Sequence, residues 1–188
     1  MKKLIVGCLT ILMSFLSCTK EDSQELTFLG DSIIQLWDVK RQFPTFVTHN
    51  LGRSESGIDY VESLTGKFQG QTVIVETGTN DIGHIVNEEL YVDRYIKSVE
   101  RLHAERIILM SILPRGVNPQ ANAQMSNPRI RRLNQSIQRK AVEQGWVFVD
   151  IFDDLSENGC MSPAYTYDGI HPNADGYAVM KREIMKHL

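Results

Sequence analysis

The chain has 188 residues, of which 42% are hydrophobic and 23% are charged, and its formal net charge at pH 7 is -3. This composition fits one globular domain that is large enough to bury a substantial core. Because the chain has no basic surplus and no block of Lys and Arg, it is not expected to bind nucleic acid.

The first residues have the pattern of an export signal. Lys2 and Lys3 precede an apolar stretch over residues 4–16. This stretch is shorter than the roughly 20 apolar residues that a membrane-spanning helix needs. A short apolar run after positive charges is typical of a signal peptide that is removed on export.

The end of this stretch predicts a lipid anchor. Ser17 and Cys18 resemble the lipobox of bacterial lipoproteins, which implies that Cys18 is lipidated and is the only contact with a membrane. The polar residues that follow resemble a signal for display on the outer surface of Gram-negative bacteria. We therefore expect residues 1–18 to be the signal peptide, 19–24 a linker and 25–188 the folded domain of an exported envelope protein.

The third cysteine of the sequence is expected to have a structural role. Cys8 leaves with the signal peptide and Cys18 is acylated, so Cys160 has no partner for an internal disulfide. No catalytic motif surrounds Cys160, and we expect a buried or half-buried thiol there.

From residue 25 onward, short β-rich apolar runs alternate with segments of helical periodicity, as in α/β domains with a parallel sheet. The apolar runs do not alternate with polar residues, which is expected of strands that helices cover on both faces. The predicted strands cover residues 26–29, 46–49, 72–76, 106–113 and 146–152.

Helices are predicted between these strands by apolar residues at helical spacing, over 92–102 and 130–141. Asn127 and Pro128 predict the start of the second of these helices, and Gly145 predicts its end. Asn173 is expected to cap a final helix. The loop 114–126 between strand and helix is long enough to suggest a place at the rim of a site.

A serine with the position of a nucleophile follows the first strand. Gly30, Asp31 and Ser32 form the strand-to-helix turn, at the sheet edge where open α/β folds bind ligands. The Ser32 backbone N-H would point out of a helix N-terminus, where it can stabilise developing negative charge. The tripeptide alone is also an ordinary turn sequence, because turns favour all three residue types.

Two further segments are expected beside Ser32. In a doubly wound sheet of order 2-1-3-4-5, the first and third strands are neighbours, which places Asn80 next to Ser32 at the switch point. The Asn80 amide can donate to an oxyanion there, or simply cap its own turn. Gly52, after the second strand, allows a backbone N-H to approach a ligand closely, or only satisfies a turn.

A base for the serine is predicted just before the last helix. His171 can remove the serine proton, and Asp168, three residues earlier, can hold the other ring nitrogen. The same pair would suit a metal ion, but the sequence offers no third ligand cluster, and no metal site is expected.

Together, these segments resemble the four blocks of the SGNH, or GDSL, hydrolase family in order and spacing. The blocks are GDS at 30–32, the segment around Gly52, GTND at 78–81 and DGIH at 168–171, and they span nearly the whole mature chain. The segments FLGDSIIQLWD and SILPRG look most like the platelet-activating-factor acetylhydrolase subgroup and related carbohydrate esterases. After Gly52, the sequence RSESG is longer and more polar than the glycine-rich turn of relatives.

The resemblance implies a flavodoxin-like, three-layer α/β/α sandwich around a five-stranded parallel sheet of order 2-1-3-4-5. It also implies a catalytic triad of Ser32, His171 and Asp168. The implied oxyanion hole is made by the backbone N-H groups of Ser32 and Gly52 and by Asn80. No cofactor is needed for such a reaction.

The expected function is hydrolysis of a small acyl ester, with acetyl as the acyl group and an acetylated glycan as a candidate substrate. A lysophospholipase or an acyl thioesterase on the same fold is the first alternative. A noncatalytic carbohydrate-binding lipoprotein is an alternative of another class, because fold alone does not guarantee activity. Nucleotide-binding loops are excluded, since residue 84 is His where a P-loop needs Lys, and no GxGxxG follows a strand.

Overall fold

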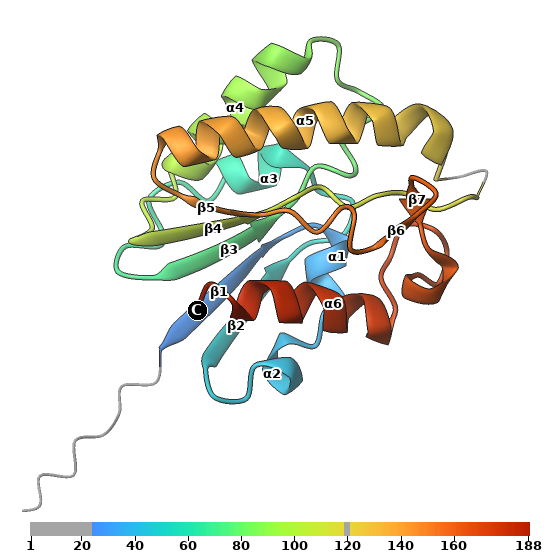
Figure 1. Ribbon diagram of the computed structural model, residues 1–188. Helices are drawn as coiled ribbons and strands as arrows, with labels where there is room; N and C mark the ends of the chain where they lie inside the picture. The colour runs from blue at the N-terminus through green and yellow to red at the C-terminus, as the bar shows by residue number, and fades with distance from the viewer. Residues whose placement is uncertain (1–23, 119–120) are drawn as a thin grey trace, which may run out of the picture.

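A computed structural model of the protein describes residues 24–118 and 121–188 (Figure 1). The predictions for the signal peptide and for Cys18 lie outside these residues. Among the helices within the described ranges, none is both long and apolar enough to cross a membrane.

The domain is built on a sheet of five parallel strands in the order β2-β1-β3-β4-β5, as predicted. Each of the five predicted strands is present, with boundaries that differ by up to a few residues at β1, β2, β4 and β5. The strands are β1 (Glu25–Gly30), β2 (Val47–Gly52), β3 (Thr72–Glu76), β4 (Arg106–Met110) and β5 (Val147–Val149).

Helices cover both faces of this sheet and give the three-layer sandwich expected from the sequence (Figure 1). One layer contains α1 (Ser32–Gln35), α2 (Val39–Gln42) and α6 (Ala174–Met185). The other contains α3 (Ile58–Glu62), α4 (Glu88–Glu100) and α5 (Ala123–Glu143). The two faces of the sheet therefore bury separate apolar cores.

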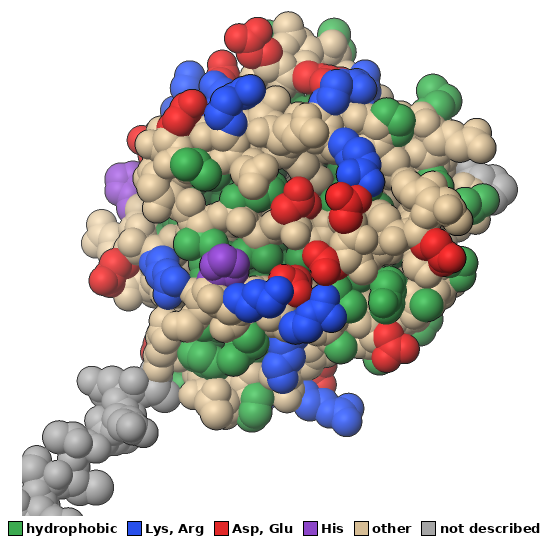
Figure 2. All heavy atoms as spheres, in the orientation of Figure 1, with side chains coloured by type: hydrophobic (Ala, Val, Ile, Leu, Met, Phe, Trp, Pro, Cys, Tyr) green, Lys and Arg blue, Asp and Glu red, His purple; other side chains and the backbone are tan. Residues whose placement is uncertain are grey.

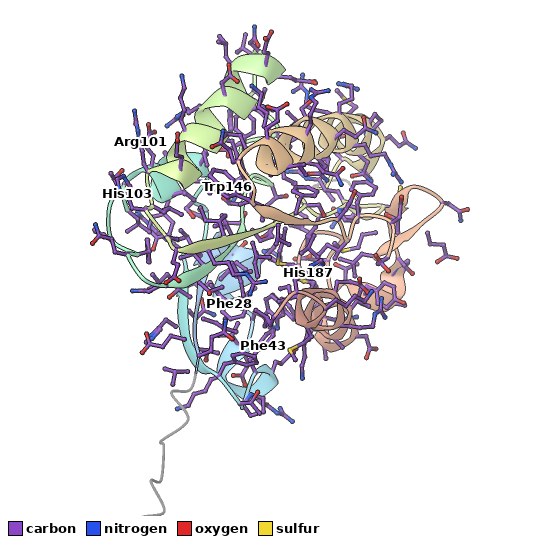
Figure 3. The ribbon with its side chains drawn as sticks, turned by 60° about the vertical axis from the view of Figure 1, so that its left-hand side comes forward. Phe28, Phe43, Arg101, His103, Trp146 and His187 are labelled. Carbon is purple, nitrogen blue, oxygen red and sulfur yellow. The ribbon has the colours of Figure 1, made fainter. Side chains whose placement is uncertain are left out.

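The aromatic side chains show this separation of the two cores. Phe28 of β1 packs against Phe43, with ring centroids 5.0 Å apart, in the layer of α2 and α6 (Figure 3). Trp37 and Tyr177 stack in the same layer at 5.4 Å. Trp146 lies against the core on the other side of the sheet. Because Trp37 follows α1 and Tyr177 lies near the start of α6, their stacking fixes these two segments to one another.

The predicted helix ends are confirmed at two places and wrong at one. Asn173 caps α6 by accepting from the N-H groups of Asp175 and Gly176, and Gly145 follows α5 with a φ of 75°. However, α5 begins at Ala123, so that Pro128 lies inside the helix. Asn127 does not cap it, because its side chain is bonded to the backbone of another loop.

Between β5 and α6, the chain forms a small hairpin and one short helix. The hairpin pairs β6 (Ser156–Glu157) with β7 (Cys160–Met161), and a 3-10 helix follows over Pro163–Tyr165. Cys160 is half-buried and has a free thiol, as expected. This segment leads the chain back to the carboxyl edge of the sheet before α6 begins (Figure 1).

Two carboxyl groups are buried where β1 and β3 end. Gly30 pairs with Glu76, and the side chains of Asp31 and Glu76 are both fully buried. One oxygen of Asp31 caps α1 through the Ile33 N-H at 2.9 Å. Its other oxygen and both oxygens of Glu76 have no hydrogen-bond partner among residues 24–118 and 121–188. Burial raises the pKa of Asp31 from 3.8 to about 7, and burial next to Asp31 raises that of Glu76 well above its ordinary value.

These raised pKa values predict a stability that falls as pH rises. In the folded state Asp31 keeps its proton up to about pH 7, whereas the unfolded chain releases it near 3.8. The contribution of these two groups to the free energy of unfolding is therefore greatest below pH 4 and decreases through the range from 4 to 7. In Asp31→Asn, an amide oxygen can still cap α1. We expect urea unfolding at pH 5 and at pH 7.5 to give a difference in unfolding free energy that is about 2 kcal/mol smaller in this variant than in the parent protein.

The matched control is Asp38→Asn, because Asp38 caps the neighbouring helix α2 from an exposed position. This control should keep the decrease of the parent protein. An identical pH dependence in the parent and in Asp31→Asn would contradict the analysis.

Candidate active site

Three predicted side chains meet at the carboxyl edge of the sheet in one hydrogen-bonded path. The Ser32 Oγ lies 3.0 Å from Nε2 of His171, and Nδ1 of the same ring lies 2.7 Å from Oδ2 of Asp168. Ser32 belongs to the turn after β1, whereas the other two residues precede α6. The fold thus brings together residues that are 139 positions apart in the sequence.

The turn after β1 determines where the Ser32 hydroxyl points. Asp31 caps α1 through the N-H of Ile33, so that Ser32 is the first helical residue. A backbone N-H in the first turn of a helix has no partner within the helix. Ser32 therefore presents both a hydroxyl and a backbone donor at the same edge of the sheet.

The loop before α6 orients the imidazole ring of His171. Asp168 Oδ1 accepts from the backbone N-H groups of Ile170 and His171, at 2.9 and 2.8 Å. Burial raises the pKa of Asp168, but the hydrogen bonds from these N-H groups and from the His171 ring outweigh burial and lower it. Asp168 is therefore ionised at neutral pH and accepts the Nδ1 proton, which leaves Nε2 free to accept the Ser32 proton.

Asn80 lies on the turn after β3, beside the turn that carries Ser32. Its Nδ2 donates to the Ser56 carbonyl at 2.9 Å. A carboxamide nitrogen carries two protons, so a second N-H of Asn80 is left for another acceptor. The next residue, Asp81, accepts from the Ile58 N-H at 3.0 Å and from the Tyr91 hydroxyl at 2.8 Å. These bonds hold the turn after β3 against the loop after β2.

Gly52, a predicted oxyanion donor, makes a hydrogen bond within its own turn in the structure. Its N-H donates to Oδ1 of Asn50 at 2.9 Å, so this N-H is not free to bind an oxyanion in the structure. A Cβ at position 52 would lie 2.1 Å from the backbone nitrogen of Gln35. Glycine is required there because β2 passes directly against the end of α1. Beyond it, Glu55 has a φ of 60°, a conformation that a non-glycine residue rarely adopts.

Sequence reasoning gave no role to Arg115, which ties the loops around the site together. The guanidinium donates to the carbonyls of Thr79 and Ala121, and to the Ser126 hydroxyl at 3.3 Å. Burial lowers the pKa of Arg115. Its backbone is held by Asn127, which accepts from the Arg115 N-H and donates to its carbonyl, both at 2.8 Å. The signal in the sequence was the segment SILPRG directly after β4.

A hollow of about 630 Å³ adjoins the outer side of Asp168. Its wall is polar at Asn118 and Glu157, and apolar at Val117 and Met161. Within residues 24–118 and 121–188, no group of three or more His, Cys, Asp or Glu side chains is placed to hold a metal ion. The hydrogen bonds between Asp168 and the His171 ring and between this ring and the Ser32 hydroxyl have the arrangement of a serine next to a general base.

Comparison of the chain with known proteins shows its family. The chain is 28% identical to an N-acylneuraminate cytidylyltransferase of Escherichia coli over 85% of its length, but it spans only 39% of that protein. It is 26% identical to the platelet-activating factor acetylhydrolase IB subunit alpha1 of Pongo abelii, over 90% of this chain and 78% of the relative.

Among solved structures, one from Streptococcus pneumoniae described as a platelet activating factor superposes with a TM-score of 0.74 and 25% identity, covering 90% of this chain and 86% of the other. Residues 28–179 match the family model of the GDSL-like Lipase/Acylhydrolase family. The chain therefore belongs to this family of carboxylic ester hydrolases.

Proposed function

We propose that the protein hydrolyses small acyl esters, with acetyl as the preferred acyl group, and that Ser32, His171 and Asp168 form its catalytic triad. The observation that carries this proposal is the unbroken path of hydrogen bonds from Asp168 through His171 to the Ser32 hydroxyl. Family membership supplies the reaction class, and the geometry supports these roles for the three residues.

The reaction proceeds in two halves. Ser32 Oγ attacks the ester carbonyl carbon as its proton passes to Nε2 of His171, and the tetrahedral intermediate carries the negative charge on oxygen. The intermediate collapses when the C-O bond to the alcohol breaks and His171 returns the proton to the alcohol oxygen. Water then attacks the acyl-Ser32 ester with His171 again as base, which releases the carboxylic acid and restores Ser32.

Two donors support stabilisation of the oxyanion. The Ser32 N-H lies in the first turn of α1, and the second amide proton of Asn80 is available beside it. The third donor predicted from sequence, the Gly52 N-H, is bonded to Asn50. The proposed hole therefore uses Ser32 and Asn80.

The surroundings of the triad favour a polar alcohol over a long acyl chain. A channel for a long chain needs apolar walls that enclose it, whereas the hollow beside Asp168 has Asn118 and Glu157 in its wall as well as Val117 and Met161. The similarity to an acetylhydrolase subunit supports acetyl as the acyl group. An acetylated glycan combines both features, and we propose this class of substrate.

The first test is hydrolysis of nitrophenyl esters from acetate to decanoate. We expect the highest kcat/KM for acetate, and a loss of at least about a thousandfold in kcat for Ser32→Ala and for His171→Ala, since the nucleophile and its base act as a unit. Full activity of Ser32→Ala would overturn the mechanism. A preference for decanoate would instead favour a lysophospholipase or an acyl thioesterase.

A second test concerns the oxyanion hole. Asn80→Ala removes a donor that acts on the transition state, and we expect kcat to fall about a hundredfold or more. The matched control is Asn87→Ala, which removes the N-cap bond to Leu90 of α4 at 3.0 Å. This control should lose about 1 kcal/mol of stability and keep its rate. Equal rates in the two variants would exclude Asn80 from the hole.

We also propose that Cys18 anchors the exported domain to the envelope. The support is the lipobox-like sequence at the end of the apolar stretch. Expressed in a Gram-negative host, the full chain should label with radioactive palmitate and sediment with membranes, whereas Cys18→Ala should do neither. Membrane sedimentation of Cys18→Ala equal to that of the parent chain would contradict the anchor.

A further inference from the structure

A second groove, with a volume of about 690 Å³, is lined by residues of α2 and α6 and by the segments that follow α1 and precede α6. Three of its wall residues are neighbours of the triad. Leu36 lies one helical turn after Ser32 on the same face, while Tyr167 and Pro172 directly precede and follow the segment from Asp168 to His171. One end of the groove is therefore formed by residues that are close to the triad in the chain.

The other end of this groove is positively charged. Arg41 of α2 and Lys181 of α6 line it, and no ion pair within residues 24–118 and 121–188 engages either of them. Asp38 is the acidic group in the same wall, and its Oδ1 accepts from the Arg41 backbone N-H at 3.2 Å. Lys and Arg side chains gather over α2 and α6 in Figure 2.

This charge is local, because the whole chain has a net charge of -3. Two elements that are far apart in the sequence supply one cation each. The distance along α6 from Ala174, near the triad, to Lys181 is roughly 10 Å at 1.5 Å per residue. A ligand attached at Ser32 would have to extend over about two linked sugar rings to meet both cations.

The walls between the two ends suit a sugar. The Tyr167 side chain is 77% exposed and borders this groove as well as the hollow beside Asp168. An exposed aromatic ring can stack on the C-H face of a sugar, and the polar wall residues can bind its hydroxyl groups. The fatty chain of an ester would gain nothing from Arg41 and Lys181 at the far end, since desolvating these cations against hydrocarbon costs free energy.

We propose that this groove binds the alcohol part of the substrate, and that this part is a saccharide with a carboxylate group, such as a uronic acid. This proposal rests on the proposed esterase function, because the groove binds part of the same ester that Ser32 attacks. Arg41 and Lys181 bind the carboxylate, and Tyr167 supports the sugar ring between the cations and the triad. Charge at the groove then selects which esters reach Ser32.

The test measures binding without turnover, in the Ser32→Ala protein, by titration calorimetry with trigalacturonate and with neutral galactotriose. We expect trigalacturonate to bind at least tenfold more tightly at low salt, with a preference that weakens as salt is added. Arg41→Gln and Lys181→Gln should each reduce trigalacturonate affinity about tenfold and leave galactotriose affinity unchanged. Tyr167→Ala should weaken both ligands.

The matched control is Lys40→Gln, which removes the same charge from an exposed position on α2 that does not line the groove. Equal affinities for the two saccharides, or equal losses in the control, would overturn the proposal. The proposal would also be overturned if a lysophospholipid bound more tightly than trigalacturonate and this binding depended on Arg41 and Lys181. Because this readout needs no catalysis, a failure of the proposed triad would leave it unchanged, and the two proposals can fail separately.

Discussion

The parallel pairing of β1 with β3 is the contact on which the proposed active site depends. Both strands end at the same edge of the sheet, so the turn that carries Ser32 and the turn that carries Asn80 start side by side. The two backbones approach so closely that a Cβ at Gly30 would lie 1.8 Å from the Glu76 carbonyl oxygen. A side chain at position 30 would separate the strands, and the donors of the proposed hole would move apart with them.

The same close pairing imposes a cost on the fold. It buries the carboxyl groups of Asp31 and Glu76 near one another, and three of their four oxygens have no hydrogen-bond partner in the described part of the chain. A buried carboxyl group avoids most of the desolvation penalty by keeping its proton, which is why its pKa is raised. The capped turn that places Ser32 is therefore accompanied by two buried carboxyl groups. Apolar side chains at the same places would stabilise the core more. Such costs are common at functional sites.

The elements that local patterns specify could be predicted from the sequence, and the contacts between distant segments could not. The uninterrupted apolar strands, the strand order and the caps at Asn173 and Gly145 follow from neighbouring residues and from the family resemblance. Asn127 followed by Pro128 also has the pattern of a helix start, but its amide bonds to Arg115 after the chain has folded. Likewise, the bond from Gly52 to Asn50 depends on side-chain rotamers that no spacing rule gives.

The loops around the triad are joined to one another as well as to the sheet. Arg115 bonds the turn before Asn80, the Asn118 side chain donates to the Asp168 carbonyl, and the Gly116 N-H donates to the Gly169 carbonyl at 2.6 Å. The loop after β4 thereby connects the turn that carries Asn80 with the segment that carries His171. Donors that are fixed before the substrate binds need no reorganisation as charge develops, and this makes them effective in catalysis. The cations of the groove, in contrast, lie on α2 and α6 outside this network, so evolution can change them without disturbing it.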